Sequence, residues 1–219
     1  MSQTIHIFSP MRSGRTVVWN VVKKAFPQKN VSLQRGAVSF NDDDLYVIVL
    51  RHPFDIIMSE LNSEELPIND STLKKCTYGY LNSGGAFLSS IDVERNNLIL
   101  LFYEDFVDNL EHILTKMGVD ANKAEIVEEF HIENVIEKSK SMKKEDFITW
   151  LHDPRGLTSE SKEFPLASMK VMAANDVWVK NKVSTYKGKT NYKDLLTNEQ
   201  IDKLNDNAVL KKIIDTFYK

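Results

Sequence analysis

The feature that most constrains the fold is an uninterrupted apolar run at residues 45–50, Leu-Tyr-Val-Ile-Val-Leu. It has the length of a strand and carries no charged residue, which is typical of a strand buried on both faces of a parallel sheet. Acidic residues at 42–44 precede the run and Arg51-His52-Pro53 follows it, so both ends of the strand are marked. The run therefore predicts a parallel β-sheet with helices on both faces.

The rest of the chain alternates between strand and helix patterns, as a parallel sheet requires. We expect strands at 4–9, 31–34, 45–51 and 98–103, and helices at 16–26, 54–62, 71–93, 106–117, 121–138 and from the capping box at 197–200 to Tyr218. The helical region over 71–93 is expected to loosen at Ser83-Gly84-Gly85. A chain of 219 residues can bury one large core. We predict a single α/β domain over residues 1–219, with a central parallel sheet flanked by helices.

A Ser/Gly turn follows the first expected strand, in Pro10-Met-Arg-Ser-Gly-Arg-Thr16. Between a strand and a helix, such a turn aims backbone N–H groups and the helix N-terminus at one point, which favours an anion. Arg12 and Arg15 add positive charge, and residues 1–41 contain no Asp or Glu. The turn is a candidate phosphate site; the alternative is a connecting turn that binds nothing.

A second cationic position comes directly after the central strand. Pro53 and Asp55 suit the first turn of the next helix, so Arg51 is expected at the carboxyl end of the strand, where ligands bind in open α/β sheets. Ser59 lies two helical turns further on and can face the same crevice. This pattern indicates a second phosphate clamp; the alternative is that Arg51 pairs with a carboxylate and caps the sheet.

In their order and spacing these motifs resemble those of the soluble, cytosolic-type sulfotransferases that use 3'-phosphoadenosine-5'-phosphosulfate (PAPS). The segment 10–17 is similar to the family's Pro-Lys/Arg-Ser-Gly-Thr-Thr/Ser-Trp loop, and 51–59 fits its Arg-x-Pro-x-Asp-x-x-x-Ser frame at every fixed position. Tyr103-Glu-Asp105 matches the family's Tyr-Glu-Asp strand end, and 187–200 resembles a worn form of its C-terminal basic segment. The resemblance extends from about Ile5 to Ile214.

The resemblance implies a P-loop-like sulfotransferase fold with PAPS as co-substrate, without a metal, and sulfuryl transfer to a hydroxyl or amine of an unspecified acceptor, whether small molecule or carbohydrate. Arg12 would stabilise the leaving phosphate oxygen, and Arg51 with Ser59 would hold the 3'-phosphate. The residues that the resemblance assigns to the nucleotide are Arg12, Ser13, Gly14, Arg15, Thr16, Arg51, Ser59, Tyr103, Lys187 and Gly188.

Two departures from the family pattern concern the adenine and the catalytic base. Val17 stands where the family has the Trp that packs on the adenine. The family's catalytic His at the end of a short strand has no counterpart in 31–35. The base is therefore expected from His52, Glu60 or the segment 138–175, unless the acceptor ionises without help.

The polar segment 138–175 is interpreted as an insertion that forms a lid or binds the acceptor, or alternatively as a surface elaboration. Two other functional classes stay open. One is a non-catalytic protein that binds PAPS or adenosine bisphosphate. The other is a nucleotide phosphotransferase, which is disfavoured because Gly-x-x-x-x-Gly-Lys-Ser/Thr is absent.

Composition disfavours several further classes. An isoelectric point near 6.0 and the lack of aromatic residues among the basic ones argue against nucleic-acid binding. No apolar stretch approaches the roughly 20 residues of a membrane span, and the N-terminal residues lead directly into a strand, so we expect no signal peptide. The single cysteine, Cys76, fits a reducing compartment, and we expect a cytoplasmic protein. Asp42-Asp43-Asp44 is interpreted as a solvated turn rather than a metal site.

Overall fold

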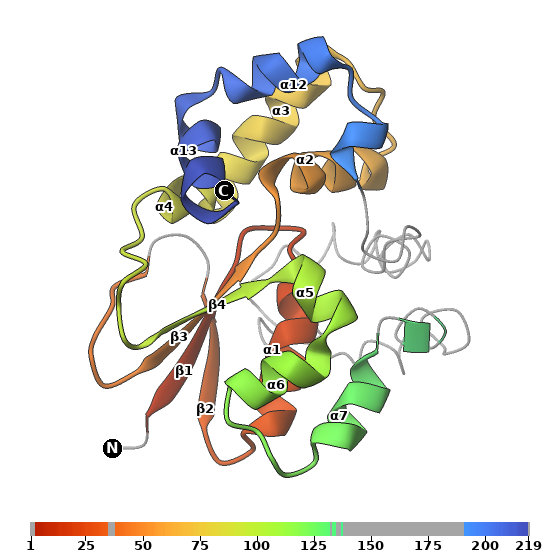
Figure 1. Ribbon diagram of the computed structural model, residues 1–219. Helices are drawn as coiled ribbons and strands as arrows, with labels where there is room; N and C mark the ends of the chain where they lie inside the picture. Colours follow the sequence, from red (N-terminus) through yellow and green to blue (C-terminus); the bar gives the residue numbers. More distant parts are fainter. Residues whose placement is uncertain (1–2, 35–37, 132, 135–136, 138–190, 219) are drawn as a thin grey trace, which may run out of the picture.

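The computed structural model describes residues 3–34, 38–131, 133–134, 137 and 191–218. Within these residues, four parallel strands form one sheet in the order β2-β1-β3-β4 (Figure 1). The strands are β1 (Thr4–Phe8), β2 (Asn30–Gln34), β3 (Leu45–Leu50) and β4 (Leu98–Phe102). The prediction of an α/β fold with a central parallel sheet is confirmed.

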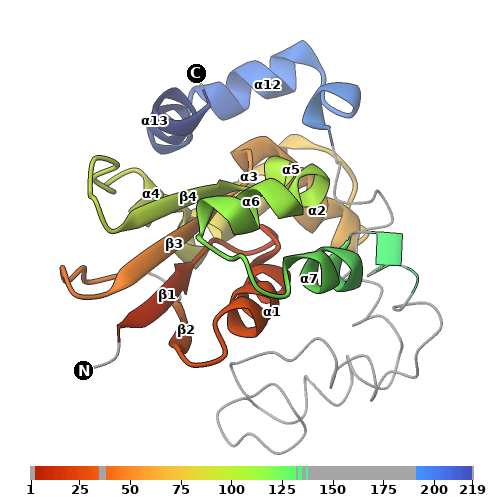
Figure 2. The same ribbon diagram turned by 60° about the horizontal axis from the view of Figure 1, so that its bottom comes forward.

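Helices cover both faces of the sheet, as Figures 1 and 2 show. One face packs against α1 (Arg15–Ala25), α5 (Tyr103–Asp108), α6 (Leu110–Lys116) and α7 (Lys123–Phe130). The other packs against α2 (Pro53–Ser63), α3 (Asp70–Tyr80), α4 (Ala86–Leu88), α12 (Asn198–Asn205) and α13 (Ala208–Phe217).

The apolar run of β3 supplies both cores. Val47 and Val49 belong to the cluster on the α1 face, whereas Ile48 and Leu50 belong to the cluster on the α2 face. Because successive side chains of a strand point to opposite faces, a strand between two helical layers must be apolar throughout. This explains why the run at 45–50 lacks the alternation of a half-exposed strand.

The strand order reverses between β1 and β3. The chain passes from β1 through α1 to β2 on one side and then enters β3 on the other side of β1. In open α/β sheets, the crevice at such a switch in strand order is where ligands bind. Phe8 pairs in register with Ile48, so the loop after β1 and Arg51 after β3 lie at the same edge of the sheet.

The helical region after α3 differs in part from the sequence prediction. A π-helical turn, η1 (Leu81–Gly85), interrupts it where Ser83-Gly84-Gly85 was expected to loosen it. Gly84 there has φ 118, a value that side chains rarely adopt. The predicted continuation to Val93 is wrong, because α4 ends at Leu88 and turns follow.

Three other predicted helices are shorter or divided. The helix expected at 106–117 is α5 and α6, separated at Asn109. The helix expected at 121–138 begins as α7, which ends at Phe130, and the described residues 133, 134 and 137 are helical again. The capping box at Thr197 is confirmed at the start of α12. The last helix breaks before α13 because the Asn207 side chain accepts hydrogen bonds from the N–H groups of Val209 and Leu210 and starts a new helix.

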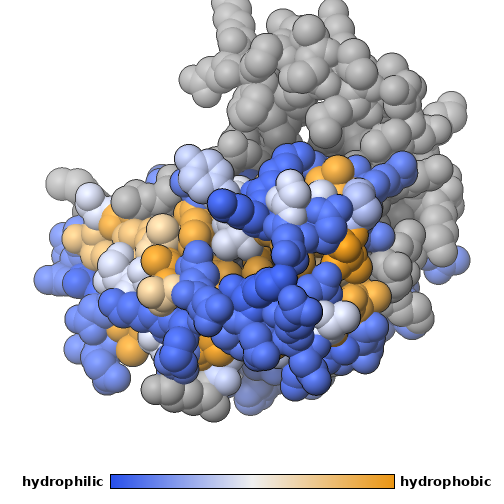
Figure 3. All heavy atoms as spheres, turned by 90° about the horizontal axis from the view of Figure 1, so that it is seen from above, coloured by the Kyte–Doolittle hydropathy of each residue, from blue (hydrophilic) through white to orange (hydrophobic). Residues whose placement is uncertain are grey.

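The outer face over the C-terminal helices is mainly hydrophilic, with separate apolar areas (Figure 3). Leu204, Leu210 and Ile213 point inward and are buried. None of the helices in the described part of the chain is long and apolar enough to cross a membrane.

Candidate functional site

Three segments that are distant in sequence meet at the carboxyl edge of the sheet. Gly14, at the N-cap of α1, has φ 75, and a Cβ atom placed on it would clash with Cε2 of Tyr103. The guanidinium carbon of Arg51 lies 4.9 Å from the centroid of the same Tyr103 ring. Tyr103 therefore packs against both the Ser/Gly turn and Arg51, and Gly14 is required by backbone conformation and by space.

Arg51 is buried, with 4% of its surface exposed. Its Nη1 donates a hydrogen bond of 2.8 Å to the carbonyl oxygen of Arg12, whereas Nη2 is buried and has no partner among the described residues. No described carboxylate forms an ion pair with Arg51, so the sheet-capping alternative is not observed in this part of the chain. A buried cationic donor without an acceptor is costly, which makes this position suited to an anion.

The N-terminus of α1 opens onto the same edge. No side chain caps this helix and its first turn contains no acidic residue, so backbone N–H groups of the first turn lack intrahelical acceptors and the helix dipole favours an anion. Thr16 lies in this first turn. The backbone at the start of α1 thus has N–H groups that a ligand could occupy.

Two side chains of the turn serve its internal structure. The hydroxyl of Ser13 is fully buried, donates to the carbonyl oxygen of Pro10 at 2.6 Å and is hydrogen-bonded to Ser9. Nη1 of Arg15 donates to the carbonyl oxygen of Ser9 at 3.3 Å. At Ser13, the backbone amide rather than the hydroxyl is therefore the group that can bind a ligand.

Arg12 reaches from the turn to the last part of α2. Its Nε lies 2.6 Å from Oε2 of Glu60, and its Nη2 donates to Oγ of Ser63. Glu60, named above as a candidate base, is thus the ion-pair partner of Arg12. Ser59 precedes it on α2, is half-buried, and its hydroxyl makes no hydrogen bond to another described residue. The sequence analysis did not identify Ser63, because no local pattern relates it to a turn so far away in the chain.

His52 makes the contacts of a structural residue. Its Nδ1 accepts a hydrogen bond of 3.3 Å from the N–H of Phe54 and caps α2. Its ring stacks on Tyr192 with centroids 4.6 Å apart. Burial, with a smaller effect of Lys193, lowers the pKa of His52 to about 4. Its neutral imidazole at pH 7 has one nitrogen engaged by the helix, which weakens its candidacy as a catalytic base.

Two acidic motif residues have contacts that the sequence did not indicate. Oδ1 of Asp55 accepts the N–H of Tyr192 at 2.7 Å, and burial raises the pKa of Asp55 to about 6. Oε1 of Glu104 accepts the N–H of His52 at 3.2 Å. Through Asp55, α2 anchors the start of the described C-terminal part, where η2 (Tyr192–Asp194) lies. Lys187, Gly188 and the segment 138–175 lie outside the described residues.

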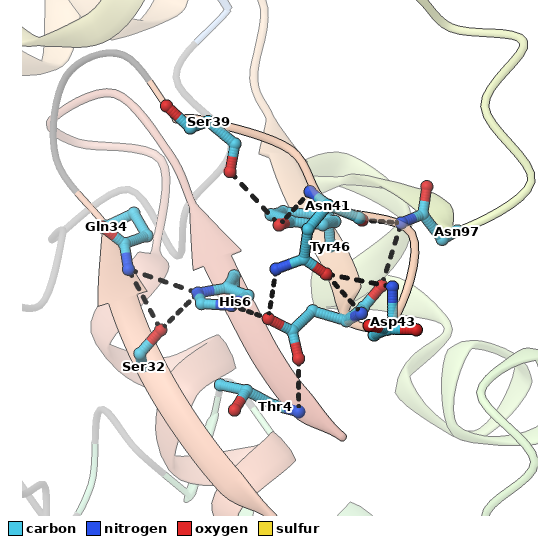
Figure 4. A network of polar contacts seen from close by, with 10 residues as sticks. Thr4, His6, Ser32, Gln34, Ser39, Asn41, Asp43, Tyr46 and Asn97 are labelled. Atoms are coloured by element: carbon cyan, nitrogen blue, oxygen red, sulfur yellow. Dashed lines mark hydrogen bonds and ion pairs between the residues drawn. The ribbon is translucent and has the colours of Figure 1, made fainter. Parts of the chain in front are cut away.

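A separate polar cluster crosses the sheet from β2 to the start of β3 (Figure 4); we call it the His6 network. Asp44 accepts hydrogen bonds from Asn41 Nδ2, His6 Nε2 and the N–H of Thr4 at 2.7, 2.9 and 2.8 Å, and these lower the pKa of Asp44 to about 2. The hydroxyl of Ser32 lies 2.8 Å from the other ring nitrogen of His6. Because Asp44 is ionised, His6 donates to it through Nε2 and accepts from Ser32 through Nδ1. The sequence analysis did not identify His6.

Within the described ranges, no group of three or more His, Cys, Asp or Glu side chains is arranged to hold a metal ion. The arrangement at the carboxyl edge is instead a set of cationic and amide donors around the turn between β1 and α1, suited to phosphate or sulfate groups. No protein-family model matches the chain, and no curated protein matches its sequence.

Proposed function

We propose that this protein binds PAPS and transfers its sulfuryl group to a hydroxyl or amine acceptor. The observation that carries the proposal is the buried Arg51, whose Nη2 has no acceptor among the described residues and whose Nη1 is bonded to the turn between β1 and α1. A phosphate at Nη2 would satisfy a donor that otherwise bears a desolvation cost.

The proposal requires two anionic groups of one ligand at two neighbouring positions. The N-terminus of α1 and Arg12 would bind the 5'-phosphosulfate, and Arg51 with Ser59 would bind the 3'-phosphate. The hydrogen bond from Arg51 to the carbonyl oxygen of Arg12 supports this, because it links the two positions directly. Tyr103 supports it further, since its ring contacts both Arg51 and Gly14.

The chemistry would be an in-line displacement. The acceptor oxygen or nitrogen attacks sulfur, the bond between sulfur and the bridging phosphate oxygen breaks, and the acceptor loses its proton to a base or to solvent. Negative charge grows on the bridging oxygen, where Arg12 and the first amides of α1 would stabilise it. His52 is not favoured as the base, because a pKa lowered to about 4 makes it a weak proton acceptor and because its Nδ1 caps α2.

The test is a comparison of nucleotides by isothermal titration calorimetry. We expect adenosine 3',5'-bisphosphate to bind at least about tenfold more tightly than adenosine 5'-phosphate, because only the former has a group for Arg51. Equal affinities would contradict the proposal. A clear preference for ATP with magnesium would favour a phosphotransferase.

A second candidate function is binding of PAPS or its product without catalysis. The observation that favours it is that His52, the base candidate nearest to Arg51 in sequence, serves as a helix cap. Incubation with labelled PAPS and a panel of phenols, sugars and amines separates the two functions. Sulfated product indicates the enzyme, whereas tight nucleotide binding without product on any acceptor indicates the binding protein.

A further inference from the structure

The backbone of Arg12 adopts a conformation that needs support from its surroundings. Its φ is 60, which lies in the left-handed region that residues other than glycine rarely adopt. Such residues persist where neighbouring contacts hold them, and they concentrate at functional sites. The contacts at Arg12 therefore identify the groups that maintain the shape of the turn.

Arg12 is held at its backbone by Arg51, which follows β3, and at its side chain by residues of α2. At the backbone, its carbonyl oxygen accepts the hydrogen bond from Nη1 of Arg51 at 2.8 Å. At the side chain, Nε pairs with Oε2 of Glu60 at 2.6 Å and Nη2 donates to Ser63. The hydroxyl of Ser63 donates to the carbonyl oxygen of Glu60 at 3.0 Å, so its lone pairs face Arg12.

The pair of Arg12 and Glu60 is partly shielded from water. The side chains are 24% and 13% exposed, whereas those of the neighbouring pair of Lys75 and Glu64 are 65% and 42% exposed. Shielded ion pairs are weakened less by solvent and salt than exposed ones. Of these two pairs, only the one with Arg12 is expected to fix the position of its arginine or lysine.

We propose that Glu60 is a positioning residue that holds Arg12 in its strained conformation for anion binding. Ser63 contributes by accepting a second hydrogen bond from the same guanidinium group. α2 begins two residues after Arg51, and its C-terminal part binds the side chain of Arg12. One helix therefore fixes the positions of both arginines. The inference rests on the proposed function for the identity of the ligand. The group that Glu60 orients belongs to the turn that would receive the phosphosulfate.

The experiment is a double-mutant cycle with Glu60→Ala, Arg12→Ala and the double variant, each titrated with adenosine 3',5'-bisphosphate and with inorganic pyrophosphate. Glu60→Ala should weaken binding about tenfold in the wild-type background and have no further effect once Arg12 is replaced. Glu64→Ala, at the C-cap of the same helix, is the matched control and should leave both affinities unchanged. A merely structural role of Glu60 would weaken binding equally in both backgrounds and would overturn the inference.

Thermal unfolding of each variant tests whether it is folded. If Glu60→Ala does not fold, Ser63→Ala takes its place in the cycle, with a smaller loss of about threefold that again vanishes without Arg12. Unchanged affinity in Glu60→Ala or, in its place, Ser63→Ala overturns the inference. If the wild type binds pyrophosphate but does not discriminate the 3'-phosphate, the proposed function fails and the pyrophosphate cycle still decides on Glu60. If the wild type binds neither probe, both proposals are overturned.

Discussion

Two polar clusters lie on the same sheet and are built in opposite ways. In the His6 network, Asp44 accepts three hydrogen bonds and both ring nitrogens of His6 have partners. At the carboxyl edge, Arg51 keeps a buried Nη2 without a partner in the described part of the chain, and Arg12 has a positive φ. The first arrangement suits stability. The second retains unsatisfied donors and strain, which is expected where a ligand completes the structure.

The largest expected effect is at Arg51. Arg51→Met should weaken binding of adenosine 3',5'-bisphosphate by about 2–5 kcal/mol, because a buried charge pair is lost, and leave adenosine 5'-phosphate almost unaffected. Calorimetry with both nucleotides measures the difference. Arg95→Met is the control: Arg95 also lies over an aromatic ring, that of Phe40, but pairs with Asp42 away from the edge. Equal losses of affinity for both nucleotides would show that Arg51 does not bind the 3'-phosphate.

The next effect concerns turnover. If Arg12 stabilises the leaving oxygen, Arg12→Ala should lower kcat by about 10²- to 10³-fold, as the loss of one preorganised donor does. Arg12→Lys should recover part of the rate, because the positive charge remains. The measurement is the steady-state rate with an acceptor found in the panel above. Turnover at the wild-type rate in Arg12→Ala would exclude this role.

Two glycine substitutions have a smaller expected effect, on the free energy of unfolding. Their comparison separates the steric clash with Tyr103 from the cost of a positive φ. Gly14 and Gly118 both have positive φ, but only a Cβ on Gly14 would meet Tyr103. Gly118→Ala should lower the free energy of unfolding by about 1 kcal/mol, and Gly14→Ala by about 1–3 kcal/mol more, because of overpacking. Chemical denaturation measures both. If the two losses are equal, the Tyr103 ring is not held against the turn as tightly as described.

Local patterns predicted the frame of the site but not its contacts. The apolar run at 45–50 and the turn at 10–16 are signals within a few residues, and strand order then brings Arg51 and Gly14 together. Partners such as Arg12 and Glu60 are separated by 48 positions and are joined only by the packing of α2. No short-range pattern encodes such a pair.

The same limit applies to the two histidines near the sheet. His52 follows a strand end, as a catalytic residue would, but its ring caps α2 and stacks on Tyr192, far along the chain. His6 stands in a strand between Ile5 and Ile7, where the alternation indicates only which face it occupies. Its partner Asp44 belongs to an acidic run that is indistinguishable in sequence from an exposed turn.

The free energy of unfolding should depend on pH in opposite directions in the two regions: the contribution of Asp44 grows as the pH rises, and that of Asp55 falls. Asp44 has its pKa lowered from 3.8 to about 2 by hydrogen bonds in the His6 network. An acid with a lower pKa in the folded state stabilises the protein above pH 3.8, and this contribution is lost as the pH falls towards 2. Asp44→Asn should therefore unfold more readily than the wild type at pH 6, with the difference shrinking between pH 4 and 2. A constant difference across that range would show that Asp44 is not held by charge-dependent hydrogen bonds.

Asp55 should give the opposite sign, because burial raises its pKa from 3.8 to about 6. An acid with a raised pKa stabilises the folded state below pH 3.8, and the contribution is lost as the pH rises through 6. Asp55→Asn keeps an oxygen that can accept the N–H of Tyr192 and cannot ionise, so relative to the wild type it should gain stability between pH 4 and 6. His52, with its pKa lowered to about 4, titrates in the same window, but it is present in both proteins and cancels in the difference. Denaturant unfolding of both proteins at successive pH values measures this difference, and a flat curve would mean that the Asp55 carboxylate is solvated rather than buried.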